Sequence, residues 1–381
     1  MYNLGRENTG LIAKWWRNVD KQILFLFTLL LLLGLLFSFS STTSIISEKM
    51  NKQTYFFFIK HLIFVVISFF VIFIISIQEK KKLIKFLTYL FFFSIMLLFL
   101  TLIIGVEVKG SKRWIDVYTY FRFQPVELVK PLFIIFISKI IVSNEKIKIN
   151  KRYFHSFLIL LLIVTVLINQ PDLGQTLLLI ASWLTVIFVS GFNMLVLSIF
   201  SVILLSFVIL LIFSFPEKFG YILLRIKTFL DPNTGDNFQS QKALEAIKQG
   251  GLTGQGMGEG ILKERVPEAH TDYIIAVISE EFGVIFVLFI VIIFLFIGYK
   301  VFNKLLSISD EFLKLALVGL VSLLIVQTFI HIGVNIRMFP TTGMTLPFLS
   351  YGGSSLIGSS IIAGVILNFT RKDYLRDLKN D

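Results

Sequence analysis

The sequence contains no cysteine. This absence excludes disulfide bonds and thiolate metal sites. The chain also has no A-x-A-like cleavage site near its N-terminus, where a polar lead of some twenty residues runs into an apolar stretch of full spanning length. We therefore expect an uncleaved first helix rather than a signal peptide. A P-loop is missing as well: the glycine-rich stretch LTGQGMGEG lacks a Lys-Ser/Thr ending and follows no predicted strand, which argues against an NTPase.

Apolar residues, in contrast, make up 56% of the 381 residues, and runs of about twenty of them recur along the chain. Each run is long enough to span a bilayer as a helix. The net charge of +12 is compatible with nucleic-acid binding, but in such a chain it favours cationic loops on the cytoplasmic side of a membrane. The sequence therefore predicts an all-α polytopic membrane protein with no nucleic-acid partner.

We expect ten transmembrane helices in a single membrane domain over residues 1–381. Their approximate ranges are 22–41, 55–77, 84–106, 124–143, 154–168, 173–190, 194–215, 273–299, 312–336 and 344–369. An even number places both termini on one side, and the short loops of that side carry most of the Lys and Arg residues, so both termini are expected in the cytoplasm. The cytoplasmic ends are then 1–21 and 370–381, and the long loop 216–272, between the seventh and eighth helices, is extracytoplasmic. Within that loop, SQKALEAIKQGG predicts a short amphipathic helix that ends at Gly250–Gly251.

The segments rich in glycine, proline and charge all fall at the outer ends of the predicted helices, so we expect any chemistry at the outer leaflet. One of them, QPVELVKP, opens the fourth helix. Its Glu127 and Lys130 are three residues apart, so they share a helix face and can pair. Two interpretations stay open: an ion pair with Lys130 snorkelling outward, or a cation that lines a polar cavity, because intramembrane charge is costly and usually functional.

Three further features lie at the same outer ends. Arg113 and Trp114 form a basic–aromatic cluster that suits a phosphate or a sugar. Asp172, in NQPDLGQT, begins the sixth helix and is expected to be its N-cap. Pro347 and Gly352–Gly353 interrupt the last hydrophobic helix. Such irregular backbone is tolerated where it is buried in protein or lines a cavity, although small residues also serve helix packing.

The stretch HTDYIIAVISEEFG places titratable groups at the mouth of the eighth helix. Thr271 or Asp272 is expected to cap this helix, which is the purely structural interpretation. Glu280 and Glu281 lie two turns deeper. Because a carboxylate that faces lipid is costly, both should face a cavity or a cationic partner.

The motifs follow one another in the order GSKRWI, QPVELVKP, QPDLG, a glycine-rich segment that leads into PEAHTDYI and EEFG, and PTTGMTLPFLSYGGSS. In this order the chain resembles the SEDS family, whose members polymerise the glycan strands of the bacterial cell wall. FLDPNTGDNFQSQKALEAIKQGG and FPTTGMTLPFLSYGGSS are more similar to its division branch, FtsW, than to its elongation branch, RodA. The resemblance implies a peptidoglycan glycosyltransferase that uses lipid II at the outer face of the bacterial cytoplasmic membrane, at the division septum. It also implies partners: a class B penicillin-binding protein (an FtsI-like transpeptidase) and other division proteins.

The resemblance assigns roles to residues as well. Asp272 matches the family's catalytic aspartate, with Tyr273 in place of the usual Phe, and is expected to act as general base toward the attacking sugar hydroxyl. Cations are expected to offset the charge that develops on the diphosphate. The candidates for substrate binding are Arg113, Trp114, Glu127, Lys130, Glu264, Glu268, His270, Arg337 and Ser350. Three of them, Glu264, Glu268 and His270, are compatible with positioning Asp272 or with binding a divalent cation, Mg or Mn.

Three alternatives stay open: a RodA-type elongation polymerase, a lipid II flippase and a non-catalytic scaffold of the division machinery. A flippase should line a path through both leaflets and often has inverted repeats. No repeat is visible in the sequence, and the polar motifs gather at the outer half. Every matched motif residue is present, which does not favour a scaffold that has lost catalysis.

Overall fold

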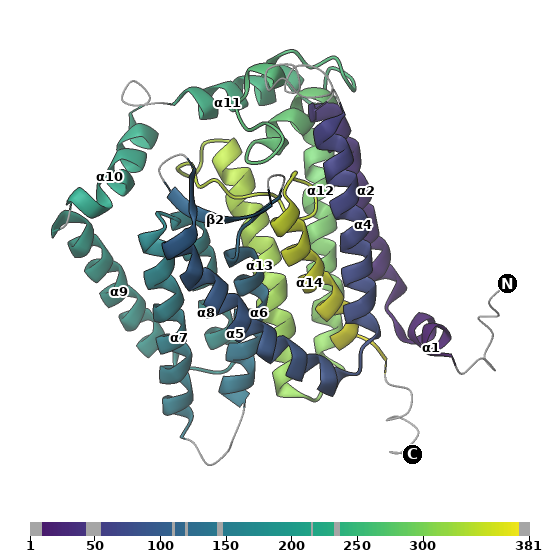
Figure 1. Cartoon of the computed structure of the whole chain (residues 1–381), viewed down its shortest axis with the longest axis vertical. Helices are drawn as coiled ribbons and strands as arrows, with labels where there is room; N and C mark the ends of the chain where they lie inside the picture. The colour runs from purple at the N-terminus through teal and green to yellow at the C-terminus, as the bar shows by residue number, and fades with distance from the viewer. Residues whose placement is uncertain are drawn as a thin grey trace.

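The computed structural model is a bundle of long, roughly aligned helices (Figure 1). It describes residues 10–42, 55–108, 111–118, 121–142, 148–214, 216–231 and 237–372. Most of the expected cytoplasmic tail, the first nine residues of the expected cytoplasmic N-terminal segment and residues 232–236 of the expected long loop lie outside these ranges.

Ten helices coincide with the ten expected spans. They are α2 (Lys21–Thr42), α4 (Phe56–Ile77), α5 (Lys80–Ile104), α6 (Val126–Val142), α7 (Ile149–Asn169), α8 (Leu173–Val189), α9 (Met194–Ser214), α12 (Ile274–Leu305), α13 (Glu311–Asn335) and α14 (Gly353–Phe369). Within the described ranges, six of them, α2, α4, α5, α7, α12 and α13, are long and apolar enough to cross a bilayer. The polytopic helical fold is confirmed.

The remaining helices lie at the two ends of the bundle (Figure 1). The short helix α1 (Leu11–Asn18) lies at one end, beside the start of α2. At the other end, α10 (Pro216–Leu230), α11 (Phe238–Gly250) and the 3-10 turn η1 (Leu262–Arg265) form the long segment between the seventh and eighth spans. The amphipathic helix that the sequence predicts there is confirmed as α11, which ends at Gly250 with Gly251 at φ 56°.

A small antiparallel sheet, which the sequence analysis did not predict, follows α5. Its strands are β1 (Val106–Val108), β2 (Ser111–Tyr118) and β3 (Phe121–Phe123), in the order β1-β2-β3. Trp114 pairs with Val106 on one side of β2, and Ile115 pairs with Phe123 on the other. The helical prediction is therefore incomplete at this point: β2 lies near the α10–α11 end of the bundle and carries Arg113 and Trp114 there (Figure 1).

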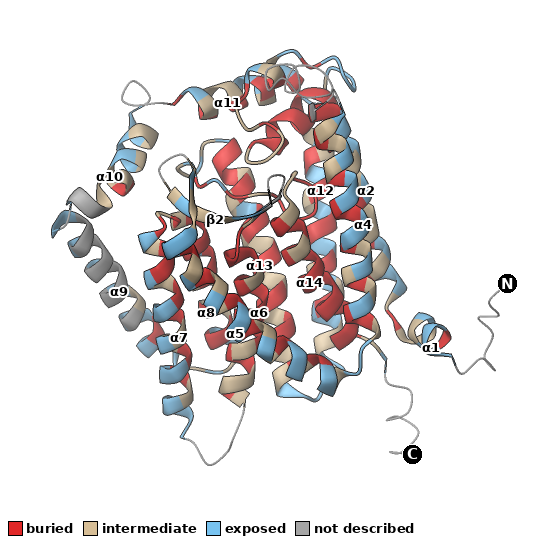
Figure 2. Ribbon diagram, viewed as in Figure 1, coloured by how far each residue is buried: buried red, intermediate tan, exposed pale blue. Residues whose placement is uncertain are grey.

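The core of the bundle is formed by α6, α13 and α14, whereas outer helices such as α4 and α7 leave one face exposed (Figure 2). α14 packs against α4, α6 and α13. Its glycines permit this close approach: a Cβ at Gly358 would lie 2.4 Å from the Glu127 carbonyl oxygen, and one at Gly364 would lie 2.8 Å from Cβ of Ile75. The exposed faces are rich in apolar side chains, as expected where a helix meets lipid.

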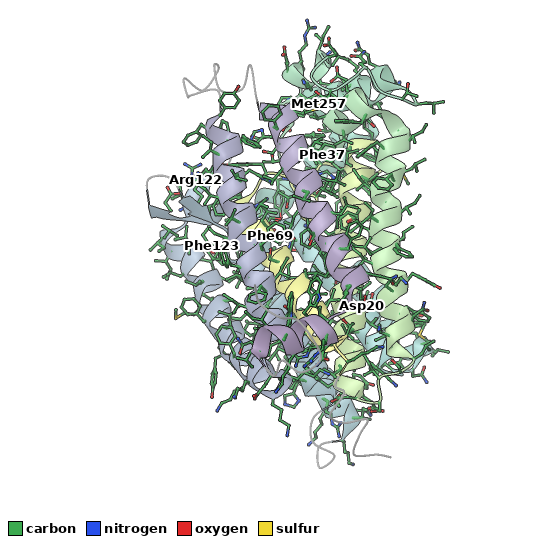
Figure 3. The ribbon with its side chains drawn as sticks, turned by 90° about the vertical axis from the view of Figure 1, so that its right-hand side faces the viewer. Asp20, Phe37, Phe69, Arg122, Phe123 and Met257 are labelled. Carbon is green, nitrogen blue, oxygen red and sulfur yellow. The ribbon has the colours of Figure 1, made fainter. Side chains whose placement is uncertain are left out.

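The two ends of the bundle are fastened in different ways. At the end marked by Asp20 in Figure 3, that carboxylate accepts backbone hydrogen bonds at the start of α2 and pairs with Lys304 of α12 at 3.1 Å. There the ends of the described chain meet, because the backbone N–H of Lys372 donates to the Asn18 carbonyl at 3.1 Å. Met257, in the glycine-rich segment, marks the opposite end (Figure 3).

Two helix boundaries differ from the sequence prediction. The last helix begins at Gly353 rather than at residue 344, and residues 339–352 form turns and irregular backbone that holds Pro347. The eighth span runs to Leu305 and is broken at Gly283, whose φ of 79° and ψ of 172° are not helical. A positive φ there suits only glycine without strain, and the break frees backbone groups of α12 for partners outside the helix.

Candidate active site

A polar cavity of about 310 Å³ opens at the α10–α11 end of the bundle. It lies between β2, the first turns of α6 and α8, the residues just before α12, and the irregular segment before α14. Five of the ten residues that the sequence analysis selects line it: Arg113, Trp114, Glu127, Glu268 and Asp272. The fold therefore brings together residues that are up to 159 positions apart in the chain, as far as Arg113 is from Asp272.

Asp272 lies in a turn that precedes α12. The N-cap of that helix is Tyr273 and no side chain caps it, so the expectation that Thr271 or Asp272 is the cap is wrong. The turn is held from both sides instead. The Asp272 backbone N–H donates to the Glu268 carbonyl at 3.1 Å, and Asn335 Nδ2 of α13 donates to the Asp272 carbonyl at 3.1 Å. These bonds fix the backbone of Asp272 beside the cavity.

Arg113 is fastened to the turn between α7 and α8. Its guanidinium donates to the carbonyls of Gln170, at 3.1 Å, and Pro171, and its Nη1 lies 3.6 Å from Oδ1 of Asp172. Asp172 also accepts from the Gln175 backbone at the start of α8, so its predicted role as N-cap is confirmed. The Asp172 carboxylate thus caps α8 and also holds the guanidinium of Arg113, in β2, against the start of that helix.

Gly343 lies close to both the Asp272 carboxylate and the Arg113 guanidinium. A Cβ added at this glycine would lie 3.6 Å from Oδ2 of Asp272 and 3.9 Å from Nη1 of Arg113. The carboxylate and the guanidinium therefore flank one point, across the backbone of the segment that precedes α14. A φ of 70° at Gly343 adds a conformational reason for glycine at this position.

Glu127 and Lys130 form the ion pair that their spacing predicts, at 2.8 Å. Both side chains are almost fully buried, and each has a further partner: Gln175 Nε2 donates to Glu127 at 2.9 Å, and Lys130 Nζ donates to Gln327 at 3.2 Å. Lys130 is 1% exposed, so it does not snorkel outward. Glu127 lines the cavity, and Lys130 lies behind it.

The other selected residues do not line the cavity. Ser350 donates to the Thr271 carbonyl at 2.7 Å and so supports the turn of Asp272. Arg337 lines a neighbouring cavity of about 160 Å³. The His270 ring packs between Phe57 and Tyr351, and Glu264 belongs to η1.

The described side chains do not form a complete set of ligands for a divalent cation. No three His, Asp or Glu side chains of the described ranges gather as metal ligands would. The His270 imidazole instead packs with its ring centroid 5.5 Å from that of Phe57 and 5.6 Å from that of Tyr351.

Sequence reasoning missed several residues of the cavity, notably Arg225 of α10, Gln239 of α11 and His331 of α13. His331 had a usable signal, because it follows Gln327 by four residues on an otherwise apolar helix and so shares its face. Arg225 had none, since a cation in a predicted outer loop is unremarkable. Burial lowers the pKa of Arg225, and the neighbouring Arg113 lowers it further.

Glu280 and Glu281 belong to a second polar cluster. We call this cluster the loop anchor; it also contains Ser40, Lys263 and the glycine-rich segment 250–260. Glu281 pairs with Lys263 and accepts from Ser40 and from the Gly258 backbone, so the predicted cationic partner is confirmed. Among the residues that the structure describes, Glu280 has no cationic partner; it accepts from the backbone N–H groups of Leu262 and Lys263 at 2.7 and 2.6 Å.

The glycines of the loop anchor allow the backbone of segment 250–260 to pack closely against the backbone of α12. At the break in α12, the carbonyls of Glu280 and Glu281 accept from the backbone of Gln255 and Gly256 at 2.9 and 3.0 Å. A Cβ at Gly254 would lie 2.2 Å from the Glu281 carbonyl oxygen. The glycine-rich segment is therefore packed against α12, which leaves its backbone N–H groups occupied rather than arranged to cradle a phosphate.

The comparisons with known proteins agree with this architecture. The family model described as "Cell cycle protein", of FtsW, RodA and SpoVE, matches residues 20–375. The chain belongs to this family, a class of helical membrane proteins. Among its relatives, "Probable peptidoglycan glycosyltransferase FtsW" of Caulobacter vibrioides is 32% identical over 368 residues, which cover 96% of this chain and 93% of the relative. The protein of the same name from Haemophilus ducreyi is 34% identical over 299 residues, 76% of this chain and 73% of the relative.

Solved structures share the fold. One chain, from a structure described as "Structural coordination of polymerization and crosslinking by a peptidoglycan synthase complex", matches with a TM-score of 0.75 at 24% identity and covers 95% of this chain and 99% of its own. Thermus thermophilus RodA matches with a TM-score of 0.67 at 23% identity over 93% of this chain and 97% of its own.

Proposed function

We propose that this chain is a peptidoglycan glycosyltransferase that polymerises lipid II at the outer face of the cytoplasmic membrane, with Asp272 as general base. The family membership and the FtsW relatives support the enzyme class. One observation carries the assignment of the base: Asp272 Oδ2 and Arg113 Nη1 flank the same point of a polar cavity, beside Gly343. In such an arrangement the carboxylate can take the proton of the attacking hydroxyl, and the guanidinium can offset the negative charge that develops on the leaving group.

The reaction requires a sugar hydroxyl to attack the anomeric carbon of lipid II from the face opposite the diphosphate. The new C–O bond forms as the bond to the diphosphate breaks, and that oxygen leaves with the electron pair. The hydroxyl proton passes to the Asp272 carboxylate, which must come within hydrogen-bond reach of it. Arg113, held by Asp172 and by two backbone carbonyls, offers donors to the departing diphosphate.

The remaining candidates have supporting roles in this proposal. Trp114 and Glu127 line the cavity and are placed to contact the sugars. Lys130 sets the charge and the position of Glu127 through their ion pair. Glu268, His270 and Ser350 hold the turn of Asp272, Glu268 through a 3.1 Å hydrogen bond from Thr271 and Ser350 through the Thr271 carbonyl. Arg337 and Glu264 stay candidates at the edge of the site.

The deciding test is polymerisation of lipid II by the purified protein with a class B penicillin-binding protein, in the presence of moenomycin to silence other polymerases. Gels should show glycan ladders from the wild type and none from Asp272→Ala. Ladders of equal intensity from both proteins would exclude Asp272 as the base. Ladders from neither, with both proteins folded and the partner bound, would exclude a polymerase and return the flippase and the scaffold.

We further propose an FtsI-like class B penicillin-binding protein and other division proteins as partners, and the division septum as the place of action. The FtsW relatives support this choice. A fluorescent fusion of the chain should gather at the septum of dividing cells. A signal confined to the side wall would assign the chain to elongation instead.

A further inference from the structure

A second, apolar cavity adjoins the polar cavity. This apolar groove, about 250 Å³ in volume, lies between α8, α10 and α13. Its walls include Leu177 of α8, Ile222 and Ile226 of α10, and Ile330 of α13. Leu177 is 57% exposed and Ile226 is 41% exposed, so the groove opens toward the surroundings of the bundle. Because these helices are framed by membrane spans, that opening faces the region where lipid chains lie.

The groove and the polar cavity are adjacent and share part of their lining. Arg225, Thr341 and Thr342 line both of them. Arg225 also lines the smaller cavity that holds Arg337. A ligand that occupied both the apolar groove and the polar cavity would pass the guanidinium of Arg225.

Arg225 is suited to an anion at this junction. Its Nη1 donates to the Thr341 carbonyl at 3.1 Å, and within the described ranges it forms no ion pair. Arg113, which does pair with Asp172, is close enough to lower the pKa of Arg225. Asp172 and Asp272 act in the opposite sense and raise that pKa. Arg225 and Arg113 both line the polar cavity, and a diphosphate there offers several oxygens for the forked donors of both guanidinium groups.

We infer that Arg225 binds the diphosphate of a polyprenyl-linked sugar, with the polyprenyl chain in the apolar groove and the sugar in the polar cavity toward Asp272. The inference rests on the proposed function and adds the direction in which the substrate lies. The order of surfaces, apolar groove, cation and polar cavity, matches the order of groups in such a ligand: hydrocarbon chain, diphosphate and sugar. A phospholipid offers a single phosphate and a small headgroup, which leaves the polar cavity unfilled.

The first experiment measures binding without turnover. A polyprenyl diphosphate that carries no sugar, and has a photoreactive diazirine near the start of its chain, is irradiated with the purified protein, and labelled peptides are identified by mass spectrometry. Labels should fall on α8 near Leu177 and on α10 near Ile222 and Ile226, and lipid II should suppress them. Labels that excess phospholipid removes equally well, or labels spread over the outer face of α12, would overturn the inference.

Variants of Arg225 test the cation. Arg225→Ala should lower the labelling yield at low probe concentration about tenfold or more, because charge-assisted hydrogen bonds are lost, and Arg225→Lys should restore part of it. The matched control is Lys227→Ala, which removes an exposed cation of the same helix that lines neither cavity. Equal losses in Arg225→Ala and Lys227→Ala would mean that net charge alone attracts the probe, and the assignment of Arg225 would fail.

Variants of the groove test the chain. Leu177→Trp should raise KM for lipid II with a long polyprenyl chain several-fold and leave KM for a short-chain analogue unchanged. Ile285→Trp, at an equally exposed position of α12, is the control and should change neither. An unchanged KM for the long chain in Leu177→Trp, with labelling elsewhere, would place the chain outside the groove.

Failure of this inference can be told apart from failure of the proposed function. If the wild type gives ladders but no labels in the groove, the chain is still a glycosyltransferase, and the proposed placement of the polyprenyl chain in the groove is rejected. Labels in the groove without ladders would retain the binding site and reject the polymerase.

Discussion

The stretch from Glu264 to Gly283 supplies carboxylates to two regions that treat them differently. In the loop anchor, both oxygens of Glu280 and both of Glu281 accept hydrogen bonds from groups of the protein itself. In the polar cavity, Asp272 and Arg113 flank an open volume of about 310 Å³, and Arg225 has one carbonyl partner. A buried charge whose partners are all internal stabilises one structure, whereas a charge that also borders an open cavity can contact a ligand. Substitutions in the two regions should therefore separate stability from activity.

The largest effect is expected from Asp272→Asn. The amide keeps the size of the side chain but cannot take the proton, so polymerisation should fall by about 10²- to 10⁴-fold. The melting temperature should stay close to that of the wild type, because the Asp272 hydrogen bonds to Glu268 and Asn335 use its backbone. Gel assays and thermal melts in detergent measure the two quantities. A protein that keeps its rate but melts early would place Asp272 with the loop anchor instead.

Lys263→Met is the counterpart in the loop anchor. It leaves Glu281 buried without its cation, which is expected to lower the free energy of unfolding by about 3–5 kcal/mol. The double variant Lys263→Met/Glu281→Leu should recover much of the loss, because neither charge then stays buried. Lys242→Met, which removes one partner of a more exposed pair with Glu245, should cost at most about 1 kcal/mol. Equal melting temperatures for Lys263→Met and Lys242→Met would contradict the anchor.

Gly254→Ala should also destabilise the loop anchor, by about 1–3 kcal/mol. Its φ is 80°, and the added Cβ would lie 2.2 Å from the Glu281 carbonyl oxygen, so the segment must move off α12. Gly258→Ala is the matched control: its φ is 87°, but nothing lies within 4 Å of its Cβ, and the cost should be about 1 kcal/mol. Thermal melts compare the two, and a larger loss in Gly258→Ala would refute the packing explanation.

The smallest effect is expected from Ser350→Ala, which should lower both stability and activity slightly. Loss of the hydroxyl removes the 2.7 Å bond to the Thr271 carbonyl and the 2.8 Å bond from the Leu346 backbone, at a cost of about 1–2 kcal/mol. Because Ser350 only supports the turn of Asp272, kcat should fall while KM for lipid II stays unchanged. A rise in KM alone would mean that Ser350 contacts the substrate itself.

The features that could be predicted from the sequence are those with a local cause. Runs of apolar residues place the spans, and the spacing of three residues pairs Glu127 with Lys130. Asp172 caps α8, and the amphipathic pattern before Gly250 forms α11. In each case the partners lie within a few residues of one another, so the pattern alone contains the contact.

The features that escaped prediction depend on contacts between distant parts of the chain. Lys263 reaches Glu281 only because the glycine-rich segment folds back along α12. Arg225 of α10 lines the cavity beside residues that are far from it in the chain, and β2 exists because β1 and β3 pair with it on either side. Asp272 was selected through a family resemblance, and its catalytic role stays a prediction until an Asp272 variant is assayed for polymerisation.

The place of α14 in the chain has a consequence for biosynthesis. Arg113, Asp172 and Asp272 leave the ribosome before the segment that holds Gly343, which forms the remaining wall of the cavity. That segment is joined to α14, which follows α13 in the chain and packs along α4 and α6. In a nascent chain, Arg113, Asp172 and Asp272 are thus already made while the cavity is still open on one side. The insertion of α14 is therefore the step at which we expect the cavity of a newly made molecule to close.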